Sequence, residues 1–250
     1  MNPELPPPKE PPETVPREQF PPTQWTQVQL AARAEDSDAG RAALEALCGR
    51  YWPAIYGYLR RAGHASADAE DLTQGFFATL LEDKALLRAD REGGHRFRSF
   101  LLAILKRFRV DQFRHADAQK RGRGKVVLAC DFAEVERQYL SEADSALSPE
   151  AVYDRRWAAA LLAAARQDLE RELEKAGQGA RFAELKRFLL EAGNAATYAP
   201  VAARLGISGD SVVVAVSRLR ERFRELVWRQ VQATVAATEE VPAEWRHLFR

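Results

Sequence analysis

The sequence predicts an all-α protein in which two helical domains are joined by an acidic linker. Apolar residues recur at helical spacing through most of the chain after residue 22, and capping residues, glycines and prolines mark where the runs begin and end. The helical period fades in one charged stretch, and 250 residues are enough for two domains with a core each. We therefore expect a tail over 1–22, a helical domain over 23–120, a linker over 121–147, a second helical domain over 148–236 and a C-terminal extension over 237–250.

The tail is predicted to be disordered because of its composition. Nine of the chain's 13 prolines lie in residues 1–22. Such a segment cannot form a regular helix or a central strand. A short first helix is expected after it, around Trp25–Ala32.

Three longer helices are expected in the first domain. One covers 38–62 and is followed by Gly63; apolar residues recur through it at helical spacing. Ser66 is the expected N-cap of the next, which continues to Glu82. Two glycines, Gly93 and Gly94, then separate it from a helix over 96–120.

The second domain is expected to begin at Ser148 and Pro149. A capping hydroxyl followed by proline is a helix-start signal. The first helix continues to about Lys175, the second covers 180–191, and helices follow through Arg229 and beyond. Between the domains, the segment over 121–147 loses the helical period and is predicted to be a linker with a short extended piece over 125–130.

The helix over 96–114 has an apolar arc and a basic half on a helical wheel. The apolar arc consists of Phe97, Phe100, Leu101, Ile104, Leu105 and Phe108. The basic half is assigned Arg98, Lys106, Arg107, Arg109 and Arg114, with Phe113 among them. Lys and Arg neutralise phosphates and an aromatic ring can stack on an unpaired base, so this face is a candidate nucleic-acid surface. The alternative is a solvated basic face with Phe113 packed on a neighbouring loop.

Residues 198–217 fit a helix-turn-helix. Ala202 is small where two helices approach, and Gly206 suits a left-handed turn four residues later. Leu205, Ile207, Val212 and Ala215 are the expected core. The second helix is expected to begin near Ser208 and to expose Gly209, Asp210, Val213, Val214, Ser217 and Arg218, with Arg220, Arg222 and Arg224 suited to the DNA backbone. A helical hairpin that does not bind DNA is the alternative.

Composition disfavours several other classes. There is no apolar run long enough to span a membrane and no secretory signal, so we expect a cytoplasmic protein. Cys48 and Cys130 are expected to be reduced and structural. His64, Asp68 and Glu70 are a weak metal candidate, and no phosphate-binding glycine loop, dinucleotide fingerprint or nucleophile–base pair is present. We expect no metal, no cofactor, no small-molecule substrate and no enzymatic activity.

Four passages resemble the extracytoplasmic-function (ECF) group of sigma-70 family sigma factors, and the resemblance covers about Phe20 to Thr234. Arg50–Arg61 looks like the start of region 2 and Asp68–Phe77 like its core-polymerase-binding segment. Phe97–Arg114 looks like the part that melts and reads the −10 element, and Tyr198–Leu226 like region 4, which reads the −35 element.

The resemblance implies a factor that binds core RNA polymerase, directs it to promoter DNA and assists −10 melting. It implies core-polymerase binding by Asp68, Glu70, Asp71 and Gln74, with Phe76 and Phe77 in the core. It implies −10 binding by Arg98, Lys106, Arg107, Arg109, Phe113 and Arg114. It implies −35 binding by Ser208, Asp210, Val213, Val214, Ser217, Arg218, Arg220 and Arg222.

Other features keep alternatives open. Arg107 stands where the family often has Asn, so the resemblance implies no −10 preference. The acidic segment over 131–150 resembles a linker that passes along the RNA-exit path, or is a solvated spacer. An anti-sigma protein is a further partner that the resemblance allows. The rival function is a stand-alone helix-turn-helix transcriptional regulator that binds duplex DNA without core polymerase.

Overall fold

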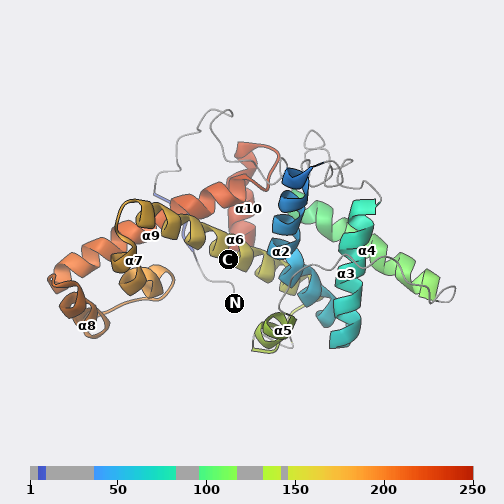
Figure 1. The fold of residues 1–250 in the computed structure, drawn as a ribbon, viewed down its shortest axis with the longest axis horizontal. Coiled ribbons are helices and arrows are strands. Elements are labelled where there is room, and N and C mark those ends of the chain that lie inside the picture. Colours follow the sequence, from blue (N-terminus) through green and yellow to red (C-terminus); the bar gives the residue numbers. More distant parts are fainter. Residues whose placement is uncertain (1–4, 10–36, 83–95, 117–131, 142–145, 250) are drawn as a thin grey trace. The chain divides into compact units, whose positions relative to one another are not determined.

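The computed structural model describes residues 5–9, 37–82, 96–116, 132–141 and 146–249 (Figure 1). None of these residues lies in a strand, and most lie in helices, which confirms the predicted all-α class. The contacts divide the chain into two compact units. The first, here the α2 unit, comprises Phe20–Ala160 and Ala233–Glu240, and the second, the α9 unit, comprises Met1–Gln19, Leu161–Gln232 and Val241–Arg250.

The α2 unit contains the three long helices that the sequence predicts. They are α2 (Asp38–Arg61), α3 (Ser66–Glu82) and α4 (Phe97–Ala116). Ser37 caps α2, because its hydroxyl accepts a hydrogen bond from the Gly40 N–H at 3.0 Å. Aromatic side chains fill the core: Tyr51, Trp52, Phe76, Phe77, Phe97 and Trp157 are fully buried. The predicted helix over Trp25–Ala32 lies outside the described residues.

Helix α6 (Pro149–Lys175) begins where the Ser148–Pro149 pair predicts. The Ser148 hydroxyl accepts a hydrogen bond from the Ala151 N–H at 3.2 Å. The first part of α6, through Ala160, belongs to the α2 unit, and the part from Leu161 belongs to the α9 unit. By its contacts, the start of α6 belongs with α2, α3 and α4 and not with the rest of α6. The predicted domain boundaries stay a prediction.

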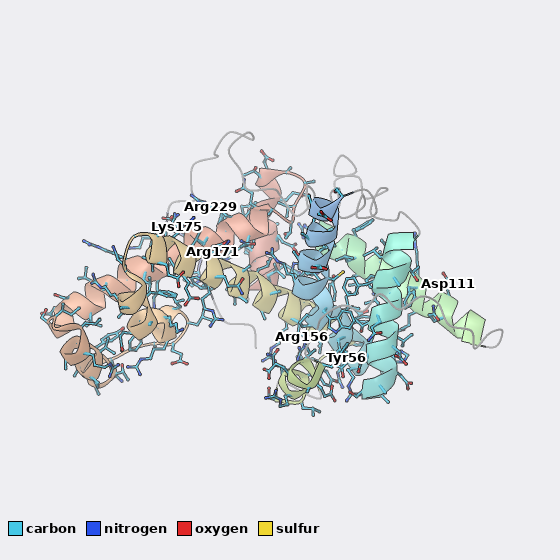
Figure 2. The ribbon with its side chains drawn as sticks, viewed as in Figure 1. Tyr56, Asp111, Arg156, Arg171, Lys175 and Arg229 are labelled. Carbon is cyan, nitrogen blue, oxygen red and sulfur yellow. The ribbon has the colours of Figure 1, made fainter. Side chains whose placement is uncertain are left out.

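The segment interpreted as a linker contains a helix, α5 (Phe132–Ser141). Tyr56 and Arg156 lie beside it (Figure 2): the Tyr56 O–H donates to Glu136 at 2.6 Å, and the Arg156 guanidinium lies 5.6 Å from the Tyr139 ring. Arg60 forms an ion pair with Glu136 at 2.8 Å. Burial would raise the pKa of Glu136, but the hydrogen bonds from Arg60 and Tyr56 outweigh it and lower that pKa. In this part of the linker, acidic charge is used within the α2 unit.

The α9 unit contains the rest of α6, α7 (Gly179–Leu185), the 3₁₀ helix η3 (Lys186–Leu189), α8 (Ala195–Leu205), α9 (Gly209–Gln232) and α10 (Val241–Leu248). A second 3₁₀ helix, η4 (Thr238–Glu240), belongs to the α2 unit. In the C-terminal extension, Trp245, Leu248 and Phe249 are buried, and the Trp245 ring lies 5.6 Å from that of Trp228 in α9. Helix α10 of the extension therefore packs within the α9 unit.

Residues 5–9 differ from the disorder that we expected of the tail. Leu5 and Pro8 are buried, and Lys9 donates a backbone hydrogen bond to Glu221 at 2.9 Å. Composition alone could not show this, because the contacts are made with residues more than 200 positions away. The other residues of the tail lie outside the described part of the chain.

Candidate polymerase and nucleic-acid interfaces

Helix α3 presents the predicted polymerase-binding residues on one side. Asp68 and Asp71 are exposed, Glu70 and Gln74 are half-buried, and the Gln74 amide donates to Glu70 at 3.4 Å. At 100° per residue these four positions fall within an arc of about 160°. The opposite side is buried and includes Ala69, Thr73, Phe76, Phe77 and Leu80. The burial of both phenylalanines confirms their predicted core role.

Helix α4 places only part of the predicted basic set on its surface. Lys106 and Arg107 are exposed, and Arg109 is half-buried with its guanidinium 5.6 Å from the Tyr58 ring. That geometry is a cation–π contact, which holds Arg109 against the unit. The side chains of Phe113 and Arg114 lie outside the described part of the chain, although both residues are within α4.

Arg98 does not lie on that surface. It is 6% exposed, and its guanidinium forms an ion pair with Asp154 at 2.5 Å. The backbone carbonyl of Arg98 also accepts a hydrogen bond from the Tyr153 O–H at 3.0 Å. On the helical wheel Arg98 is only about 20° from the core residue Leu105, so α6 covers it. Arg98 is a structural residue that joins α4 to α6, and it is removed from the candidate surface.

Lys106 is paired within the unit. Its ammonium lies 2.8 Å from Glu150, and both side chains are exposed to almost half of their area. The hydrogen bond that Lys106 donates to Glu150 raises the pKa of Lys106, and the same bond lowers the pKa of Glu150. An exposed pair of this kind contributes little to stability. A phosphate could therefore replace Glu150 at a small cost.

Helices α8 and α9 form the predicted helix-turn-helix, with an angle of 98° between them. Gly206 ends α8 in the left-handed conformation, with φ 64° and ψ 32°. Asn194 and Thr197 form a capping box at the start of α8, and the Ser208 hydroxyl caps α9 by accepting from the Ser211 N–H at 3.2 Å. The predicted left-handed turn and the start of the second helix are confirmed.

The contact between these helices contains most of the expected core. Ala202 and Val212 are buried, as are Tyr198, Val201 and Val216. Leu205, Ile207 and Ala215 are half-buried. The small Ala202 side chain allows the close approach that the sequence predicts.

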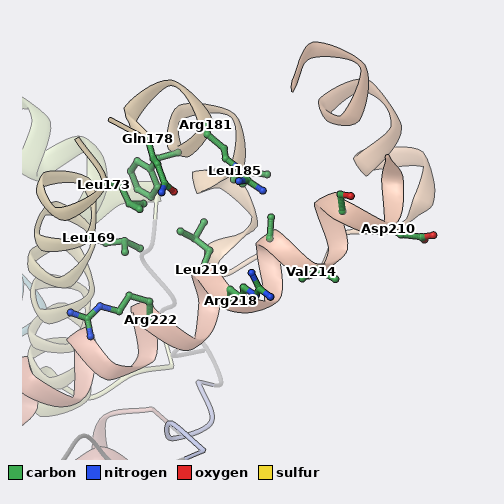
Figure 3. Close-up of a pocket in the computed structure, with 13 residues that line it drawn as sticks. Leu169, Leu173, Gln178, Arg181, Leu185, Asp210, Val214, Arg218, Leu219 and Arg222 are labelled. Atoms are coloured by element: carbon green, nitrogen blue, oxygen red, sulfur yellow. The ribbon is translucent and has the colours of Figure 1, made fainter. Parts of the chain in front are cut away.

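The exposed side of α9 is partly apolar. Val213 and Val214 are each 49% exposed, and Asp210, Ser217 and Arg218 are exposed too. A groove of about 620 Å³ lies between α6, α7 and α9 (Figure 3). Asp210, Val214 and Arg218 line it together with the apolar residues Leu169, Leu173, Phe182, Leu185 and Leu219. The predicted DNA-reading residues therefore divide between the groove side and a second side that carries Val213 and Ser217.

Arg220 and Arg222 have partners within the α9 unit. Arg220 donates to the backbone carbonyls of Phe188, at 2.7 Å, and Glu191, at 2.5 Å, so it caps the end of η3. Arg222 donates two hydrogen bonds of 2.9 Å to Glu172 and pairs with Glu225. Both were expected to face the DNA backbone. Their contacts give them a structural role, which helical periodicity cannot reveal.

Gly206 offers a prediction with an internal control. Replacing Gly206 by alanine is expected to lower the free energy of unfolding by about 1 kcal/mol, because φ is +64° there. Replacing Gly209 by alanine is expected to change it by less than about 0.5 kcal/mol or to increase it, since that glycine is in a helix. Neither added methyl group would meet an atom within 4 Å. Urea denaturation of the two variants measures the difference, and equal effects would contradict the conformational argument.

Among the described residues no group of three His, Cys, Asp or Glu side chains could hold a metal ion. Burial raises the pKa of the Cys48 thiol to about 12, so it is unreactive; Cys130 lies outside the described residues. In the described ranges no single helix is long and apolar enough to cross a membrane, and only α8 and α9 counted together, bent by 98°, meet the length and composition required.

The fold and these surfaces define a two-unit helical protein with an acidic helix, a basic helix and a helix-turn-helix. Residues 47–119 match the family described as Sigma-70 region 2. The matched segment includes most of α2 and all of α3 and α4. The match supports the assignment of this chain as a sigma factor of the sigma-70 family, with a role in transcription initiation. No curated protein and no solved structure matches the chain.

Proposed function

We propose that this protein is a sigma factor of the ECF group that binds core RNA polymerase, directs it to promoters and assists −10 melting. The observation that carries the proposal is the region 2 match over residues 47–119. The helix-turn-helix of α8 and α9, outside that match, supports it by supplying a second DNA-binding element. The function is binding and strand capture, so no bond is made or broken.

The acidic side of α3 is proposed to bind the polymerase. Asp68 and Asp71 project into solvent, and Glu70 and Gln74 extend the same side. Exposed carboxylates attract a basic partner surface over several ångströms and set the orientation of docking. Asp68 is in the first turn of α3, where the helix dipole also favours an acidic residue.

The basic side of α4 is proposed to hold the opened −10 region. Lys106, Arg107 and Arg109 are the described members, and Phe113 and Arg114 continue the same helix. Cations on a helix attract phosphates, and an aromatic ring supplies a stacking surface for an unpaired base. Glu150 must release Lys106 before that ammonium can contact a phosphate.

The first turns of α9 are proposed to read the −35 element. The residues proposed to read it are Ser208, which caps the helix, and the exposed residues Asp210, Val213, Val214, Ser217 and Arg218. Residues near the start of a recognition helix reach base edges in the major groove, and a valine can contact a thymine methyl. Arg220 and Arg222 are left out of this set because they hold η3 and α6.

The deciding experiment is capture of bacterial core RNA polymerase by the full chain. Asp68→Lys/Asp71→Lys is expected to reduce retention of core polymerase at least about tenfold, because four units of charge change on the docking surface. Glu174→Lys/Glu239→Lys makes the same charge change at exposed positions elsewhere and should retain wild-type binding. If the wild-type chain does not bind core polymerase but binds duplex DNA, the result would establish a stand-alone transcriptional regulator instead.

A further inference from the structure

The N-terminal segment Leu5–Lys9 has the pattern of a polyproline II helix with one buried side. Three successive prolines hold φ near −65°, and every residue that precedes a proline is restricted to extended backbone. Polyproline II has three residues per turn, so residues 5 and 8 lie on the same side. Leu5 and Pro8 are buried, whereas Pro6 and Pro7 are exposed. The burial pattern therefore follows the period that the prolines impose.

The start of this segment is fixed by Trp245 of α10. The indole N–H donates to the Leu5 backbone carbonyl at 2.9 Å, in a buried position. Trp245 is 3% exposed and lies in an aromatic cluster, with Phe249 at 4.9 Å and Trp228 at 5.6 Å between ring centroids. Polyproline II carbonyls have no partner within their own helix and can accept such a bond. This carbonyl therefore satisfies a buried indole donor.

The end of the segment is fixed by Glu221 of α9. Three prolines provide no backbone donor, and the first N–H after them, that of Lys9, donates to Glu221 at 2.9 Å. Arg224 also pairs with Glu221. The hydrogen bond from Arg224 and that from Lys9 lower the pKa of Glu221, so its carboxylate stays charged. The two end contacts set the register of the segment.

We propose that α9 and α10 form a binding site for a polyproline II peptide, and that the chain's own Leu5–Lys9 segment is the resident ligand. The site selects an apolar residue, three prolines and a following residue with a free N–H. The prolines are already extended before binding, so little conformational entropy is lost. This site goes beyond the proposed sigma function: its α9 contact is at Glu221, after the residues proposed to read the −35 element, and neither α3 nor α4 takes part in it.

The test uses a full chain that lacks only residues 2–9, titrated with a synthetic peptide of residues 1–12. Peptide binding is measured by ¹H–¹⁵N NMR of the Trp245 indole and by isothermal calorimetry. The shortened chain is expected to bind the peptide and to recover the indole resonance of the intact chain. The intact chain should bind it at least about tenfold more weakly, because its site is occupied.

Two peptide variants supply a matched control. Leu5→Ala removes the buried side chain and should weaken binding about tenfold or more, whereas Pro6→Ala changes an exposed residue and should weaken it less than about threefold. Trp245→Phe keeps a ring but removes the donor, and it should weaken binding in a shortened chain that still melts cooperatively. No binding at millimolar peptide, or equal affinities for the two peptide variants, would overturn the proposal.

Discussion

Replacing Asp154 by alanine is expected to lower the free energy of unfolding of the α2 unit by about 3 kcal/mol, because its Arg98 partner is buried. The Arg98 side chain is 7% exposed and the Asp154 side chain 19%, with 2.5 Å between their charged atoms. Removing the carboxylate leaves a positive charge in a poorly solvated position. Chemical denaturation followed by tryptophan fluorescence measures the loss, since Trp157 is in this core.

The control for Asp154 lies four residues earlier in α6. Glu150 also pairs with a basic residue of α4, Lys106, at 2.8 Å, but these side chains are 43% and 47% exposed. Glu150→Ala is therefore expected to cost less than about 0.5 kcal/mol. Under the proposed function it should strengthen binding to single-stranded DNA, because Lys106 becomes available to phosphate. Equal destabilisation by the two variants would contradict the difference in burial on which this argument depends.

Much of the fold follows from local sequence. The caps at Ser148 and Ser208 and the left-handed Gly206 are set by residues within one turn, so helix starts and the helix-turn-helix could be predicted. The role of Arg98 could not, because it depends on Asp154, which is 56 positions away. A helical wheel gives the angle of a side chain but does not show which neighbouring helix covers it.

The linker and the tail show the same limit. In α5 the apolar residues Phe132, Val135 and Tyr139 have helical spacing, but acidic composition and a gap in the period favoured a linker. Residues 5–9 look disordered by composition and are placed by Trp245, 240 positions away. The exposure of the predicted residues on α3 and at the start of α9 could be predicted from the sequence, since a helix surface needs no distant partner to form; their binding roles stay a prediction.

Replacing Trp157 by alanine is expected to cost about 4 kcal/mol of unfolding free energy, enough to unfold much of the α2 unit. Trp157 is fully buried, and its ring stacks on Tyr51 at 4.0 Å with 15° between the planes; Tyr153 and Phe97 lie at 5.8 and 5.9 Å. Trp157→Phe should cost less than half as much, because a ring remains and the indole N–H, which has no hydrogen-bond partner among the described residues, is removed. Thermal melts of both variants measure these losses. Because α6 supplies this ring to a core built by α2 and α4, unfolding of the alanine variant should also abolish core-polymerase binding. A cooperative melt of that variant at the wild-type temperature would show instead that the α2 unit does not need α6.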